Sequence, residues 1–142
     1  MQDAGHRCHN GNTGYLASIQ SKEENDYLLS LLQSDSNFKD HTDAWIGGCD
    51  MKSEGTFEWI SGNMLTDGVI FWTGGSPNQG GKGVEGQYNN FENGEPNESG
   101  EEDCLVMRGG KKNNPSSSSS DGQWNDVACY SPNSFFFVEF DG

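Results

Sequence analysis

The sequence predicts a single α+β domain, built from helix, several short strands and a long irregular segment. One stretch has helical periodicity behind a capping motif, and several apolar stretches have the short length of strands. The 20 glycines and 4 prolines indicate a large share of loop. The 142 residues are the length of one domain, and 8 Phe, 4 Trp and 4 Tyr can fill its core although only 31% of the chain is hydrophobic.

The helix is expected to begin directly after Ser21. Ser21 and Glu24 have the spacing of a capping box, in which the serine side chain accepts a hydrogen bond from the Glu24 amide and Glu24 reaches back. The apolar residues that follow share one helical face and are Tyr27, Leu28, Leu31 and Leu32. The sequence therefore predicts a helix that runs to about Gln33 and buries this face.

Short apolar stretches predict the strands, which are expected at residues 14–19, 44–48, 55–60, 104–107, 123–129 and 135–140, with a further apolar piece at 69–72. In the third stretch Phe57 and Trp59 alternate with Glu58, which indicates a half-buried strand with Glu58 on its polar face. Trp45, Trp59 and Trp124 fall in these stretches and are expected in the core.

Two segments carry no periodicity. Residues 63–97 are rich in glycine and predict one long irregular excursion, which in a compact domain is usually either functional or disordered. Residues 111–122 include a run of serines at 116–120, so this insertion is expected to be a flexible hairpin tip between the strands at 104–107 and 123–129.

Charge and cysteine content restrict the partners and the location of the chain. The 22 acidic and 8 basic residues give a net charge of −14, which makes nucleic acid and anionic membranes poor partners and leaves cations and neutral polar ligands. No apolar run approaches the ~20 residues of a membrane span. Four cysteines without a C-x-x-C pair favour disulfides, and therefore an extracellular or secreted protein. No signal segment is visible, so it has been removed or the chain is part of a longer one.

The stretch NGEPNESGEEDC, residues 93–104, concentrates carboxylates that repel one another. Calcium, which prefers oxygen ligands, would relieve that repulsion. Glu95 and Asn97 flank Pro96, and a cis peptide before Pro96 would aim both side chains at one point. Glu102 follows in the same segment.

Further oxygen donors, Asn125 and Asp126, come from a separate segment that ends in Cys129. A disulfide between Cys104 and Cys129 would hold this segment against the acidic stretch. The two segments together predict a calcium site that leaves room for the hydroxyl groups of a ligand.

Several motifs in this order resemble the C-type lectin domain, over roughly residues 8–140: WIG at 45–47, EGTFEWISG at 54–62, EPN at 95–97, EDC at 102–104 and WND at 124–126 before Cys129. The resemblance implies the C-type lectin-like fold, with two helices, small antiparallel sheets and a long irregular calcium-binding loop region. It also implies calcium-dependent carbohydrate binding.

The same resemblance implies that one set of side chains binds Ca²⁺ and hydrogen-bonds two neighbouring sugar hydroxyls: Glu95, Asn97, Glu102, Asn125 and Asp126. The EPN motif implies glycans of the mannose type, which include mannose, glucose, N-acetylglucosamine and fucose, whereas QPD is expected for galactose. Nearby acids hold a second ion or are solvated charge, and these are Glu98, Glu101 and Asp103.

The chain departs from the family pattern at its closing strand, where Val138 stands in place of a cysteine before Glu139. Cys8 thereby loses its expected partner, and either pairs with Cys49 or both remain thiols. Residues 1–7 show no strand pattern, so the domain is expected to lack its first strand. The closing strand would then be an exposed edge, through which the chain forms a homo-oligomer or a larger assembly.

The sequence also bears on two other functional classes. Catalysis is not expected, because no nucleophile and base occur in a recognisable context and the paired acids are assigned to the ion. The alternative to a lectin is a calcium-stabilised structural or protein-interaction module of an extracellular assembly or matrix, without sugar binding.

Overall fold

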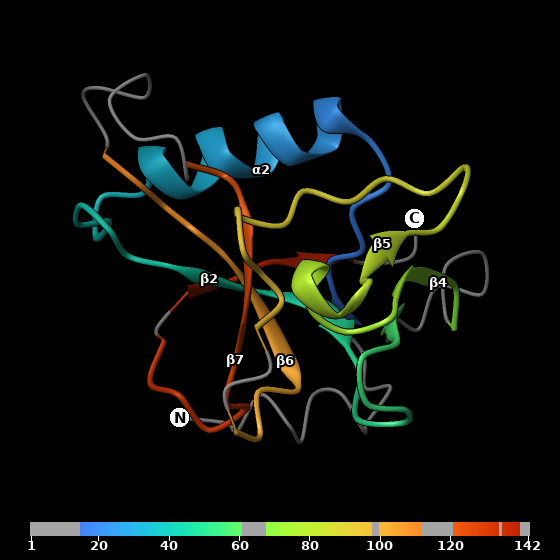
Figure 1. Ribbon diagram of the computed structural model, residues 1–142. Helices are drawn as coiled ribbons and strands as arrows, with labels where there is room; N and C mark the ends of the chain where they lie inside the picture. The colour runs from blue at the N-terminus through green and yellow to red at the C-terminus, as the bar shows by residue number, and fades with distance from the viewer. Residues whose placement is uncertain (1–14, 61–67, 98–99, 112–120, 134, 140–142) are drawn as a thin grey trace.

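The computed structural model describes residues 15–60, 68–97, 100–111, 121–133 and 135–139. In chain order its elements are β1 (Tyr15–Leu16), α2 (Lys22–Ser34), β2 (Ala44–Cys49), β3 (Phe57–Trp59), β4 (Ile70–Thr73), the 3₁₀ turn η1 (Pro77–Gln79), β5 (Lys82–Gly83), β6 (Cys104–Met107), β7 (Trp124–Val127), β8 (Phe135–Phe136) and β9 (Val138–Glu139). Helix α2 lies across one end of the molecule, above β6 and β7 (Figure 1). The α+β class is confirmed, and the described part contains one α-helix of the two expected.

Strand β2 is the centre of the larger sheet. The strand order is β5-β4-β3-β2-β6-β7, and β8 joins β2 in parallel. The first half of β2 pairs with β6 and its last residues pair with β3, both antiparallel. At Gly48 a side chain would clash with Leu105 and Phe71, so a residue without a Cβ allows the core to pack against this strand.

Aromatic side chains fill the main core. Trp59 stacks on Phe71 with ring centroids 4.3 Å apart and meets the edge of Trp124 at 5.5 Å. Such pairs contribute about 0.5–1.5 kcal/mol each beyond the area they bury. All four tryptophans are buried, which confirms the expectation for Trp45, Trp59 and Trp124.

The helix begins and ends close to the predicted limits, but it buries a different face. Ser21 accepts a hydrogen bond from the Glu24 amide at 3.1 Å, as expected. Tyr27 and Leu31, however, are 62% and 44% exposed, so the prediction that they are buried is wrong. The face that packs inward consists of Asn25, Leu28, Leu29 and Leu32.

Asn25 decides this orientation of the helix. Its amide oxygen accepts a hydrogen bond from Trp124 Nε1 at 2.8 Å, and its amide nitrogen donates to the carbonyl oxygen of Gly122 at 2.9 Å. Burying a polar side chain is favourable only with such partners. A search for apolar periodicity alone could not detect this contact.

Strand β3 also differs from expectation, because Glu58 is buried together with its neighbours. The strand lies inside the sheet, between β2 and β4, and the register places Glu58 opposite Cys49. Lys52 Nζ lies 3.9 Å from Glu58 Oε1 and offsets its charge. The face of β3 that was expected to be polar and exposed is therefore buried.

The closing segment is divided at Phe137 into two short strands. β8 pairs with β2, and β9 pairs with β1 through Tyr15 opposite Glu139 and Leu16 opposite Val138. The expectation of an unpaired closing edge is wrong for these residues, since the chain itself supplies both partners. Residues 1–7, on which the missing strand was predicted, lie outside the described residues.

The disulfide between Cys104 and Cys129 is confirmed. Cys49 is buried at the end of β2, opposite Cys104 in the sheet, whereas Cys8 lies outside the described residues. The pairing of Cys8 with Cys49 stays a prediction. β6 and β7 form the expected hairpin, and residues 112–120 of its serine-rich tip are also outside the described part.

Candidate functional site

The irregular segment before the acidic stretch is fixed to strand β7. The Trp124 amide donates to the Asn90 carbonyl at 2.8 Å, and the Glu92 amide donates to the Trp124 carbonyl at 2.9 Å. The Asn90 side chain adds a hydrogen bond to the carbonyl oxygen of Gly122 at 2.9 Å. Residues 84–92 therefore follow a defined path although they contain no helix or strand.

A tight turn then presents the EPN motif. The Glu95 amide donates to the Glu92 carbonyl at 2.9 Å, and Gly94 occupies the left-handed region with a φ of 88°. That conformation favours glycine. The Glu95–Pro96 peptide is cis, as predicted, and Pro96 is buried.

The turn brings Glu95 and Asn97 to Asp126 on β7. The Asn97 amide donates to Asp126 Oδ1 at 3.1 Å, and Asn97 Nδ2 donates to Glu95 Oε1 at 3.1 Å. Asp126 is buried, whereas Asn97 is exposed. Three of the five predicted ligands thus form one connected group at the end of the β6–β7 hairpin.

Electrostatics places Glu102 near this group. The pKa of Glu95 is raised from 4.5 to about 8, first by burial, then by the hydrogen bond and charge of Asp126, and then by the charges of Glu102 and Glu92. A carboxyl group whose pKa is raised in this way is held among negative charges. Each cause that acts on the Glu95 pKa raises it.

Two buried acceptor atoms mark the same place. Glu95 Oε2 and Asn125 Oδ1 are shielded from solvent and have no hydrogen-bond partner among the described residues. Asn125 precedes Asp126 on β7. Unsatisfied buried acceptors cost about 1–3 kcal/mol each. A cation would satisfy both atoms and offset the carboxylates, so carboxylate and amide oxygens of this set fit calcium.

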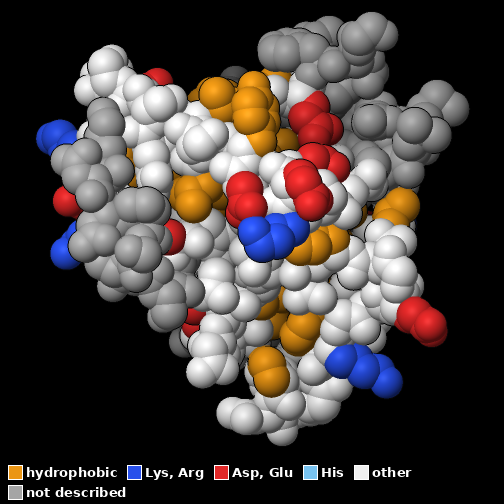
Figure 2. Space-filling model, turned by 90° about the horizontal axis from the view of Figure 1, so that it is seen from above, with side chains coloured by type: hydrophobic (Ala, Val, Ile, Leu, Met, Phe, Trp, Pro, Cys, Tyr) orange, Lys and Arg blue, Asp and Glu red, His pale blue; other side chains and the backbone are white. Residues whose placement is uncertain are grey.

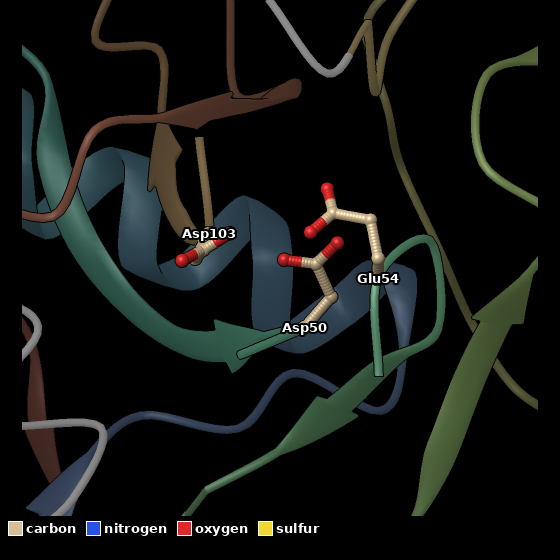
Figure 3. Close-up of side chains that lie close together, drawn as sticks. All are labelled: Asp50, Glu54 and Asp103. Atoms are coloured by element: carbon tan, nitrogen blue, oxygen red, sulfur yellow. The ribbon is translucent and has the colours of Figure 1, made fainter. Parts of the chain in front are cut away.

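A second acidic cluster consists of Asp50, Glu54 and Asp103, whose carboxylate oxygens lie within 4.8 Å of one another (Figure 3). Asp50 follows the end of β2 and is buried. Its amide donates to the Asp103 carbonyl at 3.2 Å, and its Oδ2 accepts from the Gly55 amide at 2.8 Å. Burial, then the charges of Glu54 and Glu101, raises the pKa of Asp103.

Asp103 was predicted to hold a second ion or to be solvated charge, whereas Asp50 and Glu54 were not predicted as ligands. A signal was present, because Glu54 is the first residue of the EGTFEWISG motif at 54–62 and Asp50 directly follows a buried strand. Of the other two acids considered, Glu101 is exposed and Glu98 lies outside the described residues.

The outer surface around α2 carries scattered hydrophobic side chains among charged ones (Figure 2). Within the described residues, no helix has the length and apolar character needed to cross a lipid bilayer.

Comparison with known proteins gives consistent matches. A family model described as "Lectin C-type domain" matches residues 1–136. The low affinity immunoglobulin epsilon Fc receptor of Mus musculus is 33% identical over 118 residues, which are 83% of this chain and 24% of the receptor. The mannose-binding protein of Gallus gallus is 30% identical over 124 residues, 87% of this chain and 34% of that protein.

A solved structure agrees with these relatives. The cow C-type carbohydrate-recognition domain of CD23, determined in the presence of GlcNAc2Man3 oligosaccharide, has a TM-score of 0.55 and 25% identity, covering 96% of this chain and 76% of that one. The chain spans about a quarter and about a third of the two curated relatives.

Proposed function

The chain belongs to the C-type lectin domain family, and from this premise we propose that it binds glycans of the mannose type through a calcium ion. Lectin relatives support carbohydrate binding in general, and relatives of this kind are receptors and lectins, not enzymes. The observation that carries calcium binding is the pair of buried oxygens without a hydrogen-bond partner, Glu95 Oε2 and Asn125 Oδ1; the first belongs to the carboxyl group whose pKa is raised by burial and neighbouring acids.

The residues that would hold the ion are Glu95, Asn97, Glu102, Asn125 and Asp126. When bound, calcium supplies positive charge and coordination positions for hydroxyl oxygens of a sugar. The carboxylates of Glu95 and Glu102 accept hydrogen bonds from those hydroxyls, and the amides of Asn97 and Asn125 donate to them. The site therefore offers both acceptors and donors to a vicinal pair of hydroxyl groups.

The preference for mannose-type ligands rests on the EPN motif. Asn97 Nδ2 already donates to Glu95 Oε1, and this places one donor and one acceptor side by side at an exposed position. Mannose, glucose, N-acetylglucosamine and fucose are the candidate sugars. A single site of this size binds a monosaccharide weakly, so copies in an assembly would raise avidity.

A second calcium ion is proposed at Asp50, Glu54 and Asp103, where it would join the end of β2 to the start of β6. The three carboxylates come from two separate segments and lie within 4.8 Å of one another. The location is proposed to be extracellular or secreted, because the Cys104–Cys129 disulfide is stable in an oxidising compartment.

The test is calorimetric titration of calcium into protein stripped with EDTA, followed by mannose and galactose with and without calcium. Saturable calcium binding and calcium-dependent binding of mannose in preference to galactose are expected. Asn125→Ala should weaken both, whereas Asn78→Ala, at an exposed position in η1, should leave both unchanged.

Other outcomes separate the alternatives. Calcium binding without a response to mannose or to an array of glycans would favour the structural or interaction module. Failure of calcium to bind at all would remove the proposed site.

A further inference from the structure

We propose that Arg108 positions Glu95, by clamping Glu92 at the start of the turn that presents it. The inference rests on the proposed role of Glu95 in calcium and sugar binding. It adds a pair of residues that touch neither ligand and instead fix the direction from which Glu95 reaches the site.

Arg108 joins two carboxylates from distant parts of the chain. It directly follows β6, and its Nε donates to Glu92 Oε2 at 3.2 Å while its Nη1 donates to Asp43 Oδ2 at 3.1 Å. The exposed fraction is 35% for the Arg108 side chain, 29% for Glu92 and 17% for Asp43. Partial burial reduces the screening of these charges by solvent, and hydrogen bonds between charged groups are stronger than hydrogen bonds between neutral groups.

The backbone around Arg108 is itself fixed. The Arg108 amide donates to the Gln123 carbonyl at 2.8 Å, and the Gly122 amide donates to the Arg108 carbonyl at 2.8 Å. These bonds continue the ladder between β6 and β7. The guanidinium group is therefore attached to the same hairpin that carries Asn125 and Asp126.

Glu92 is held at two points. Its amide donates to the Trp124 carbonyl of β7, and its carboxylate accepts from Arg108 beyond the end of β6. Its carbonyl oxygen accepts the hydrogen bond from the Glu95 amide that closes the turn. Fixing both the backbone and the side chain of Glu92 restricts the rotation of this turn. The position of Glu95, at the end of the turn, is restricted with it.

Arginine suits this role because its planar group offers separate donors in different directions. Asp43 occupies the other side of the guanidinium and also accepts a hydrogen bond from the Gly109 amide at 3.4 Å. Asp43 precedes β2 and has no part in the turn from Glu92 to Glu95. It therefore controls for the loss of one ion pair with Arg108, and the calcium-free readout below separates the clamp from the charge of Glu92 acting on Glu95.

The experiment compares Glu92→Ala with Asp43→Ala. Each variant removes one carboxylate, raises the net charge by one and breaks one ion pair with the same arginine. Calcium titration at pH 9, above the pKa of about 8 of Glu95, avoids differences in its protonation. Glu92→Ala should weaken calcium binding at the Glu95 site by about 10-fold, the lower end for loss of a supporting contact, and Asp43→Ala by less than about 3-fold.

A second readout does not depend on calcium. Hydrogen exchange of the Glu95 amide, measured in EDTA, should become faster in Glu92→Ala than in Asp43→Ala, because only the former loosens the turn. Equal effects of the two variants on affinity and on this exchange would overturn the clamp. If wild type bound no calcium, the proposed function would fail, while the exchange rates would still decide whether Arg108 orders the turn.

Discussion

Calcium binding at neutral pH should displace a proton from Glu95. The ion requires an ionised carboxylate, but burial and neighbouring acids raise the pKa of Glu95 to about 8 in the protein without metal. At pH 7 a group with this pKa is about nine-tenths protonated, and at pH 9 about one-tenth. Binding of one ion should therefore release about 0.9 proton at pH 7 and about 0.1 at pH 9.

The same pKa sets the pH dependence of affinity. The ionised fraction of Glu95 rises roughly 50-fold from pH 6 to pH 8, and the apparent calcium affinity of this site should rise in proportion. A carboxylate with the usual pKa of 4.5 would already be ionised over this range and would give almost no change. The magnitude therefore distinguishes the environment seen in the structure from an ordinary exposed acid.

The assay is calorimetry in pairs of buffers with different enthalpies of ionisation, such as PIPES and Tris at pH 7. The slope of the observed enthalpy against the ionisation enthalpy counts the protons released. Glu95→Gln is the control, since calcium that still binds at Asp50, Glu54 and Asp103 should do so without this proton. A slope near zero for wild type at pH 7 would refute the assignment of a protonated Glu95.

Three further predictions concern stability. Without calcium, the free energy of unfolding in urea should fall as pH rises from about 4.5 to about 8. The raised pKa of Glu95 means that the folded state binds this proton more tightly than the unfolded state does. Added calcium should remove this trend. Leu105→Ala at a fully buried position should lower the free energy of unfolding by about 2–5 kcal/mol in urea titration, and a loss under 1 kcal/mol would contradict its place in the core. Gly81→Ala should lower the thermal midpoint, because its Cβ would clash with the carbonyl oxygen of Gly75 at a cost of about 1–3 kcal/mol. Gly80→Ala is the control for backbone strain without this clash, because a Cβ at Gly80 meets no atom within 4 Å.

Local sequence signals predicted much of the fold. Ser21 and Glu24 located the start of α2, and short apolar runs located β2, β6 and β7 to within one or two residues. These features depend on hydrogen bonds and periodicities within a few residues, so the sequence alone contains them. The cis peptide at Pro96 and the Cys104–Cys129 disulfide were also predicted.

Errors arose where distant residues decide the outcome. The buried face of α2 was misassigned because Asn25, a polar residue, is paired with Trp124 and Gly122. Glu58 was placed on a polar face because alternation over three residues does not reveal that both faces of β3 are buried in the folded chain. The closing segment was expected to be open, but its division at Phe137 gives it partners in β1 and β2.

The same division holds for the candidate site. The sequence by itself determined the types of side chain in the EPN, EDC and WND motifs, and hence a chemistry of oxygen donors suited to calcium. Only the tertiary structure brought Glu95 and Asn97 to Asp126, gathered Asp50 with Glu54 and Asp103, and attached Glu92 to Arg108. The capacity of a side chain to donate an oxygen ligand is a property of the individual residue. The proximity of several such side chains depends on strand pairing and loop closure over the whole chain.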